Sequence, residues 1–385
     1  MGIFDLFTKS EKAQARKEER ARSKDLTRAQ ELQAQFENTA WPVPLKMNPV
    51  NVAGAEKTSI TDPVDKKRKD EIGPMIFAPH INAEPLKFLP LEELLFLMDT
   101  HERFHKISAL DNFEENKRVL RNELLNRIRS AESLFLLNDL STGYPFIDHG
   151  YVSLYLDKQK AEDAVKAFAA QYRNLSVKRF LGETKDDIKE KRQNLFDYLY
   201  YLGMEHILVN NGGYRASIVR SEISAPPDVA GDGKIAAQPA LCFAMCDFLG
   251  EARWNVKYEK RAEVLRAKEE KMLKLIRKGT YIVPIQHEGP AEVIGSNRLR
   301  FNSETKIRFF VLQDNKDKTF LPVFTDVQEY LKKFNTAEWE GAAFSFAQIK
   351  GMLDNRDGIV INPFGENIML LRDRIMEQEE GEAHV

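Results

Sequence analysis

A gapless internal repeat is the feature that most restricts what this chain can fold into. Residues 206–223 align with residues 358–375, and five of the 18 aligned pairs are identical. Two further pairs of segments match in the same order, 151–157 with 320–326 and 124–129 with 272–277. Because self-similarity over a supersecondary unit is typical of duplication, we expect two copies of one fold in tandem.

The aligned stretch predicts a β-hairpin in each copy, with an apolar strand, an asparagine, a glycine-containing turn and a return strand that ends in arginine. The shared residues are Asn210 and Asn362, Gly213 and Gly365, and Arg220 and Arg372. Glycine enters positive φ freely, so we expect the two glycines to supply the left-handed position of each turn.

Two interpretations remain open for the repeated asparagines and arginines. The asparagines fit turn residues that bond their own backbone, because asparagine next to glycine is ordinary turn chemistry. Alternatively, each Asn and Arg lines a groove in which the guanidinium binds a carboxylate or phosphate ligand. The arginines could equally cap the edge of the sheet through a buried carboxylate such as Asp157 or Asp326.

Apolar periodicity predicts a small mixed sheet with flanking helices in each copy. In the second copy we expect strands at 281–285, 308–312, 320–325, 341–346, 358–362 and 367–371, and helices at 327–334 and 347–353. In the first copy we expect strands at 134–137, 151–156, 175–180, 206–210 and 216–220, and helices at 161–172 and 186–201. A pair of helices precedes each sheet, at 91–105 and 113–130 and at 240–249 and 254–278. The predicted fold class is therefore α+β, with two tandem α/β modules.

The composition outside the modules predicts a helical and extended N-terminal arm. Residues 1–36 are dominated by charged residues and alanine, which favours an exposed helix. Prolines interrupt every apolar run of residues 37–89, which predicts an extended linker. The remaining divisions are a first module with its leading helices at 90–223, a linker loop at 224–239, a second module at 240–377 and an acidic tail at 378–385.

Two short motifs resemble a known family of bacterial proteins. Residues 319–326 read TFLPVFTD and residues 358–364 read GIVINPF, and each motif begins with a predicted strand. Their order and surroundings, over about 270–376, resemble the N-terminal domain of the enhanced serine sensitivity (SseB) family, with a diverged second copy at about 112–223. The resemblance implies the fold of the module and no catalytic residue, because the family is defined by sequence and fold more than by a reaction.

The balance of charge excludes a partner recruited by the electric field of the whole protein. The chain carries 57 Lys and Arg against 59 Asp and Glu, so we expect no nucleic-acid partner. It has no run of about 18 apolar residues and no secretory signal at its start, which predicts no transmembrane segment and a cytoplasmic location. Cys242 and Cys246 lie four apart on a predicted helix, where they fit core residues better than a disulfide.

Residues 101–105 read HERFH, which contains the pattern of two zinc-binding histidines and a general-base glutamate on one helix. In zinc proteases this helix is buried, whereas here Arg103 and Lys106 place charge on it. We therefore expect that His101, Glu102 and His105 do not form a complete zinc site. A zinc-dependent hydrolase that uses them is the first alternative function.

The function expected from the sequence is a non-catalytic binding or regulatory protein without a cofactor, whose partner is a protein or a small ligand. The second alternative is a scaffold that docks peripherally on a membrane or an assembly through its apolar tip. That tip consists of Ile3, Phe4, Leu6 and Phe7, which equally fit a frayed terminus.

Overall fold

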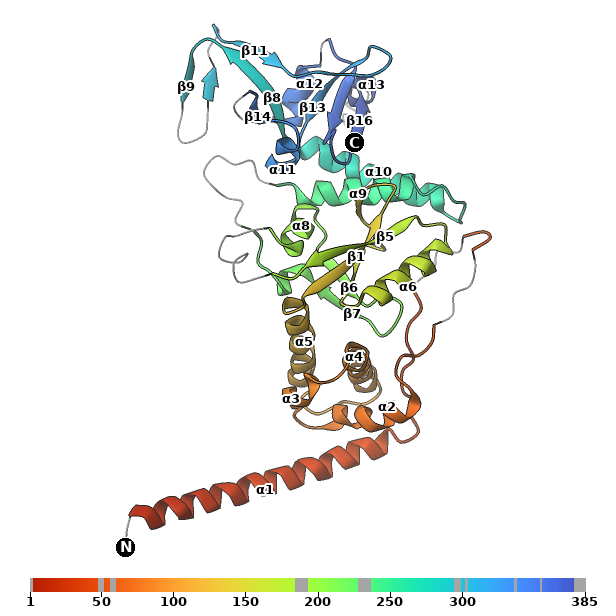
Figure 1. Ribbon diagram of the computed structural model, residues 1–385, viewed down its shortest axis with the longest axis vertical. Helices are drawn as coiled ribbons and strands as arrows, with labels where there is room; N and C mark the ends of the chain where they lie inside the picture. The colour runs from red at the N-terminus through yellow and green to blue at the C-terminus, as the bar shows by residue number, and fades with distance from the viewer. Residues whose placement is uncertain are drawn as a thin grey trace, which may run out of the picture.

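The computed structural model describes residues 3–47, 52–55, 60–183, 193–227, 237–293, 299–301, 304–335, 338–353 and 355–376. Figure 1 shows two α/β modules one above the other, with a long N-terminal helix that extends away from the first module. The mixed α+β class predicted from the sequence is confirmed.

The first module begins with two helices, α4 (Leu91–Ile107) and α5 (Phe113–Arg129). Its strands are β1 (Ser133–Asp139), β2 (Tyr144–Pro145), β3 (Ile147–Asp148), β4 (Tyr151–Tyr155), β5 (Leu175–Leu181), β6 (His206–Val209) and β7 (Ala216–Val219). Its other helices are α6 (Lys158–Ala169), α8 (Leu195–Tyr201) and the short η2 (Arg220–Glu222). The main strands lie in the order β5-β1-β4-β6-β7.

The second module begins with α9 (Pro239–Ala252) and α10 (Arg261–Lys278). Its strands are β8 (Thr280–Glu288), β9 (Ala291–Val293), β10 (Leu299–Phe301), β11 (Lys306–Phe309), β12 (Leu312–Gln313), β13 (Thr319–Val323), β14 (Glu340–Ser345), β15 (Gly358–Ile361) and β16 (Ile368–Leu371). Its other helices are α11 (Val327–Leu331), α12 (Phe346–Gly351) and α13 (Arg372–Met376).

The central strands pair in the same register in both modules. β4 and β6 are parallel and pair at Val152 and Ile207, whereas β13 and β15 are parallel and pair at the aligned positions Leu321 and Ile359. Each inner strand then forms an antiparallel hairpin in matching register, with β7 or with β16. On the other side, β1 joins β4 to β5, and β8 joins β13 to β14 through a single bridge to Phe324. The two modules therefore share one strand order.

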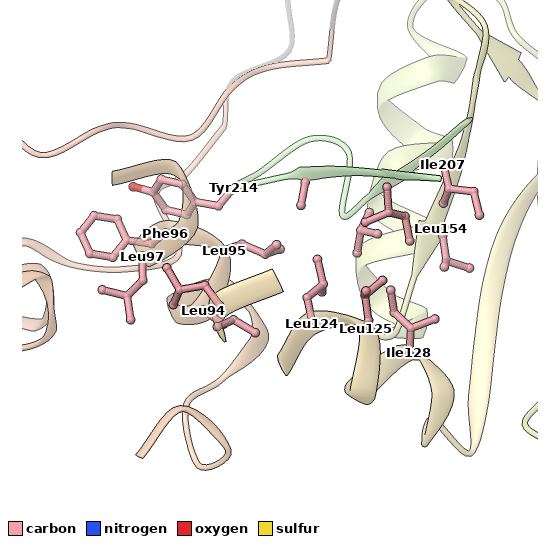
Figure 2. Close-up of a cluster of buried hydrophobic side chains, with 14 of the residues drawn as sticks. Leu94, Leu95, Phe96, Leu97, Leu124, Leu125, Ile128, Leu154, Ile207 and Tyr214 are labelled. Carbon is pink, nitrogen blue, oxygen red and sulfur yellow. The ribbon is translucent and has the colours of Figure 1, made fainter. Parts of the chain in front are cut away.

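The largest core fills the space between α4, α5 and one face of the first sheet. Figure 2 shows leucines and Phe96 of α4, together with Leu124, Leu125 and Ile128 of α5, near Leu154 of β4 and Ile207 of β6. In the second module α9 and α10 pack on β8, β13, β15 and β16. These two helices also lie between the sheets of the two modules, so that α9 contacts both modules (Figure 1).

The arm differs from the extended linker expected over 37–89. This segment contains α2 (Lys66–Ile72), η1 (Gly73–Phe77) and α3 (Ala83–Leu86). It buries apolar side chains in the largest core, as does the end of α1 (Ile3–Gln35); they include Leu32, Phe36, Val64, Ile72, Ile76, Phe77 and Leu86. Pro74 lies in the first turn of η1, where a missing amide hydrogen removes no helical bond. The prolines therefore position short helices and do not prevent folding.

Several element boundaries also differ from the expected ones. α10 begins at Arg261 and not at 254, because Lys260 has a left-handed φ of 65°. α8 begins at Leu195, where Asn194 forms a capping box with Asp197. Residues 184–192, part of the linker loop (228–236), the acidic tail and the side chains of the apolar tip lie outside the described residues. No helix in the described part of the chain is both long and apolar enough to span a bilayer.

Phe77→Ala tests whether the arm belongs to the folded core. The Phe77 ring is 2% exposed and lies 5.5 Å from the ring of Phe36 and 6.0 Å from that of Phe104. Its removal leaves a cavity, so we expect the free energy of unfolding in urea to fall by about 3–5 kcal/mol.

The control is Phe88→Ala in the same segment, because the Phe88 ring is 85% exposed. We expect this change to alter the free energy of unfolding by at most about 0.5 kcal/mol. Equally small losses in the two variants would mean that the segment is not packed.

Candidate functional site

A pocket of about 340 Å³ lies between the two modules. The first module lines it with Tyr144 at the start of β2 and with Tyr198 and Tyr201 of α8. The second module lines it with the first turn of α11 and with the loop between β15 and β16, in which Glu366 lies. The site therefore exists only because the two modules pack together.

Asn362 shapes the turn that carries Glu366. It ends β15 in the left-handed region, with a φ of 47°, and its N–H donates to the Val323 carbonyl. Its side-chain oxygen accepts from the Thr325 N–H at 3.0 Å, and its Nδ2 donates to Glu366 Oε2 at 2.9 Å. Asn362 therefore holds the end of β13, the end of β15 and one wall of the pocket together.

The two repeated glycines do not supply the left-handed positions, so that prediction is wrong. Asn210 and Asn362 take those positions, with φ of 59° and 47°, because asparagine tolerates this region. Gly365 is instead required for space, since a Cβ there would lie 2.5 Å from Glu329 Oε2 and 2.7 Å from the Tyr144 hydroxyl. Because Gly365 has no side chain, Tyr144 of the first module and Glu329 of the second can both lie against this turn.

Two buried carboxyl groups face this pocket. Glu366 is 1% exposed, and Glu329 is also buried. Glu329 Oε1 accepts from Lys332 Nζ, whereas Glu329 Oε2 and Glu366 Oε1 accept no well-formed hydrogen bond in the described part of the chain, and the Tyr144 hydroxyl lies near Glu366. Burial, reinforced by the Glu329 carboxylate, raises the pKa of Glu366 to about 7. Burial also raises the pKa of Glu329, which Lys332 opposes.

The predicted carboxylates Asp157 and Asp326 serve as helix caps. Asp326 accepts from the N–H groups of Gln328 and Glu329 at 2.9 and 3.0 Å, and Asp157 accepts from the Lys160 N–H at 2.9 Å. Asp326 also lines the pocket, and its second oxygen accepts from the Thr325 hydroxyl at 2.8 Å. Its oxygens are therefore already bonded to the protein.

The Arg220 guanidinium pairs with neither Asp157 nor Asp326. Arg220 is 1% exposed and pairs with Glu205 at 2.9 Å. Its guanidinium also donates to the Ser224 carbonyl at 3.0 Å, so it holds the end of the hairpin. The N–H of Arg372 donates to the Asp357 carbonyl at 2.7 Å at the corresponding place. Neither arginine lines the pocket between the modules.

The tyrosines and cysteines around the pocket are held in their neutral forms. Burial is the main cause that raises the pKa of Tyr144 and of Tyr198, and the Glu366 and Glu329 carboxyls raise both further. Burial likewise raises the pKa of Cys242 and Cys246 well above the ordinary value. Both cysteines are free and buried in α9, as expected of core residues, and their protonated thiols are poor nucleophiles.

The side chains of the HExxH pattern have different surroundings in the structure, although both histidine rings stack on Phe113. His101 is buried, and burial lowers its pKa to about 4. His105 Nδ1 accepts from the Leu110 N–H at 3.1 Å, and its ring stacks on Phe113. Glu102 is exposed and pairs with Lys117 at 3.0 Å. The described residues contain no group of three or more His, Cys, Asp or Glu side chains that could hold a metal ion.

The fold and the pocket define a protein of two α/β modules that enclose a small acidic site between them. Residues 259–377, which include α10 and the strands of the second module, match the family model of the SseB protein N-terminal domain. This match confirms the resemblance stated for about 270–376 and does not extend to the first module. Neither the curated proteins nor the solved structures yielded a match to the chain.

Sequence reasoning singled out Asn362 and Asp326 at this site but missed Glu329, Glu366 and the tyrosines. One signal was present in the repeat, because Glu366 aligns with Tyr214 and thus places a carboxyl where the other copy has an aromatic ring. Glu329 had no such signal. Glu329 is buried because Tyr144 and Gly365 pack beside it. The residues near Glu329 in the sequence do not indicate these contacts.

Glu366→Gln tests the buried carboxyl through the pH dependence of stability. The pKa of Glu366 is raised from 4.5 to about 7, so between these values the native protein keeps a proton that the unfolded chain loses. The resulting stability is present below pH 4.5 and lost as the pH rises to about 7. Glutamine mimics the protonated acid, so at pH 8 the variant should be more stable than the wild type by on the order of 3 kcal/mol.

Urea unfolding between pH 5 and pH 8 measures this difference. The control is Glu338→Gln, which removes an exposed carboxyl outside the pocket. A wild type and a Glu366→Gln variant with the same pH slope would contradict the expectation.

Proposed function

We propose that this protein is a non-catalytic binding protein in which the pocket between the two modules holds a small ligand. The observation that carries the proposal is the pair of unpartnered carboxyl oxygens, Glu329 Oε2 and Glu366 Oε1, at a cavity built by both modules. A buried polar atom without a partner costs free energy, which a ligand that donates hydrogen bonds would recover.

The size and walls of the pocket support a small molecule as the ligand. Its volume of about 340 Å³ lies at the lower end of the range of about 300–1,000 Å³ that is typical of small-molecule sites. Because its walls come from both modules, a bound ligand would favour one arrangement of the modules over others. We propose that this ligand-dependent bias gives the protein a regulatory role.

We further infer that the first module is a diverged copy of the SseB-type domain. The shared strand order and the shared register of β4–β6 and β13–β15 support this relationship. We place the protein in the bacterial cytosol, where free buried cysteines such as Cys242 and Cys246 are common. The high pKa of both thiols favours a binding role over nucleophilic catalysis.

A pocket-filling variant tests the proposal. Gln328 lines the pocket from the first turn of α11, and its neighbour Val327 is exposed and does not line it. In a thermal-shift screen of charged and neutral metabolites, we expect some compounds to stabilise the wild type and Val327→Trp. Gln328→Trp should lose that stabilisation, because the indole occupies the pocket.

Mass spectrometry of the recovered compound separates binding from catalysis. We expect the compound to return unchanged after incubation with the protein. Its conversion would replace the binding role with an enzymatic one, and stabilisation that survives in Gln328→Trp would place the binding site elsewhere.

A further inference from the structure

In the first module, a lysine of the same chain lies against the residue that aligns with Glu366. The residue aligned with Glu366 is Tyr214. Lys69 of α2 places its Nζ 5.6 Å from the centre of the Tyr214 ring and 5.7 Å from that of Phe96. The ammonium also pairs with Asp62 and donates to the Pro42 carbonyl at 3.1 Å. The arm thus delivers a buried cation to this position in the first module.

The first leading helix of each module lies near the aligned turn. Phe96 of α4 contacts Tyr214, with ring centres 5.5 Å apart. In the second module, Cys246 of α9 lies close enough to Glu366 for the carboxyl to add to the effect of burial on the pKa of the thiol. The turn after β6 or β15 therefore faces the first leading helix in both modules, and the space between them is where Lys69 lies in the first module.

In the second module the pocket beside the aligned turn is acidic. Among the described residues that line it, Lys332 is the only cationic side chain, and it bonds Glu329 Oε1. Asp326 is used as a helix cap. One oxygen of Glu329 and one of Glu366 are left without a partner.

We infer that the pocket between the modules binds the primary ammonium group of a small organic amine, beside the turn whose counterpart in the first module contacts the Lys69 ammonium. This inference rests on the proposed binding function and names the chemical class of the ligand. An ammonium has three N–H donors, enough for Glu329 Oε2, Glu366 Oε1 and one further acceptor.

The aromatic walls suit the same ligand. Tyr198 and Tyr201 line the pocket, and the face of a phenol ring attracts a cation. A carboxylate or phosphate ligand would instead be repelled by Glu329 and by ionised Glu366, and a neutral ligand would leave their charge unbalanced. The walls therefore select a cationic head group.

Binding of the amine should depend on pH through Glu366. The titratable and charged groups around it are Glu329, Asp326, Lys332, Tyr144, Tyr198, Cys242 and Cys246. The tyrosines and cysteines stay protonated near pH 7 because burial raises the pKa of each. Glu366, whose pKa burial raises to about 7, changes charge between pH 6 and pH 8, so the amine should bind about tenfold more tightly at pH 8 than at pH 6.

Calorimetric titration of the full chain with matched probes tests the inference. The probes are propylammonium, butylammonium and 1,4-diaminobutane, each compared with the alcohol and the carboxylate of the same chain length. We expect the amines to bind and the matched compounds not to bind. Glu329→Gln and Glu366→Gln should each weaken amine binding by roughly 10- to 100-fold, because each removes a charge-assisted hydrogen bond. Glu338→Gln should leave the affinity unchanged.

The outcomes separate the ligand class from the binding function. If an alcohol or a carboxylate binds and Gln328→Trp abolishes that binding, the pocket holds a small ligand and the amine inference is wrong. Amine binding that persists in both glutamine variants, or that does not change between pH 6 and pH 8, also overturns the inference. If no probe binds and the metabolite screen is negative, the inference and the proposed function both fail.

Discussion

The parallel pairing of one inner strand with the first strand of a hairpin is the constraint on which both modules depend. In the first module it joins Val152 to Ile207, and in the second it joins Leu321 to Ile359. Parallel strands are covered on both faces, and β15 is accordingly buried along its whole length. The pairing also brings the end of the hairpin strand beside the start of the helix that follows its partner, which places Asn362 next to Asp326.

The same backbone geometry supports different chemistry in the two copies. At one aligned position Tyr214 contacts a lysine of the arm, and at the other Glu366 faces a pocket. Burial of a carboxyl without a cation lowers the stability of the second module at neutral pH. Folded proteins keep such groups mostly where a ligand or a reaction uses them, and a raised carboxyl pKa beside a pocket fits that pattern.

The N-terminal arm distinguishes the first module from the second. Because α2 and η1 pack into the core that includes α4, the arm covers this side of the first module, and the buried ammonium there belongs to Lys69 of the same chain. The second module has α9 in the position of α4 and meets the first module where the arm would lie. The first module therefore packs against the second on the side where the arm packs against the first. Tyr144 of the first module lies against Gly365 of the second.

The sequence by itself determined the α+β class, most strands and the SseB-type match of residues 259–377, because these depend on apolar periodicity and on residues close together in the chain. It also placed Asp326 directly before a helix, which it caps, whereas the helix after Asp157 begins at Lys158 and not at 161. It misjudged 37–89, since a local surplus of prolines does not reveal that Phe77 and Leu86 have a core to enter.

Only the tertiary structure decided the pocket between the modules and the state of its acids. Glu329 and Glu366 are ordinary glutamates in the sequence, and they become buried because Tyr144, Tyr198 and α9 arrive from distant parts of the chain. The partner of Arg220 proved to be Glu205, a choice set by how the residue before β6 and the residue after β7 meet. Burial and charge pairing depend on distances between segments, and no local pattern in the chain specifies them.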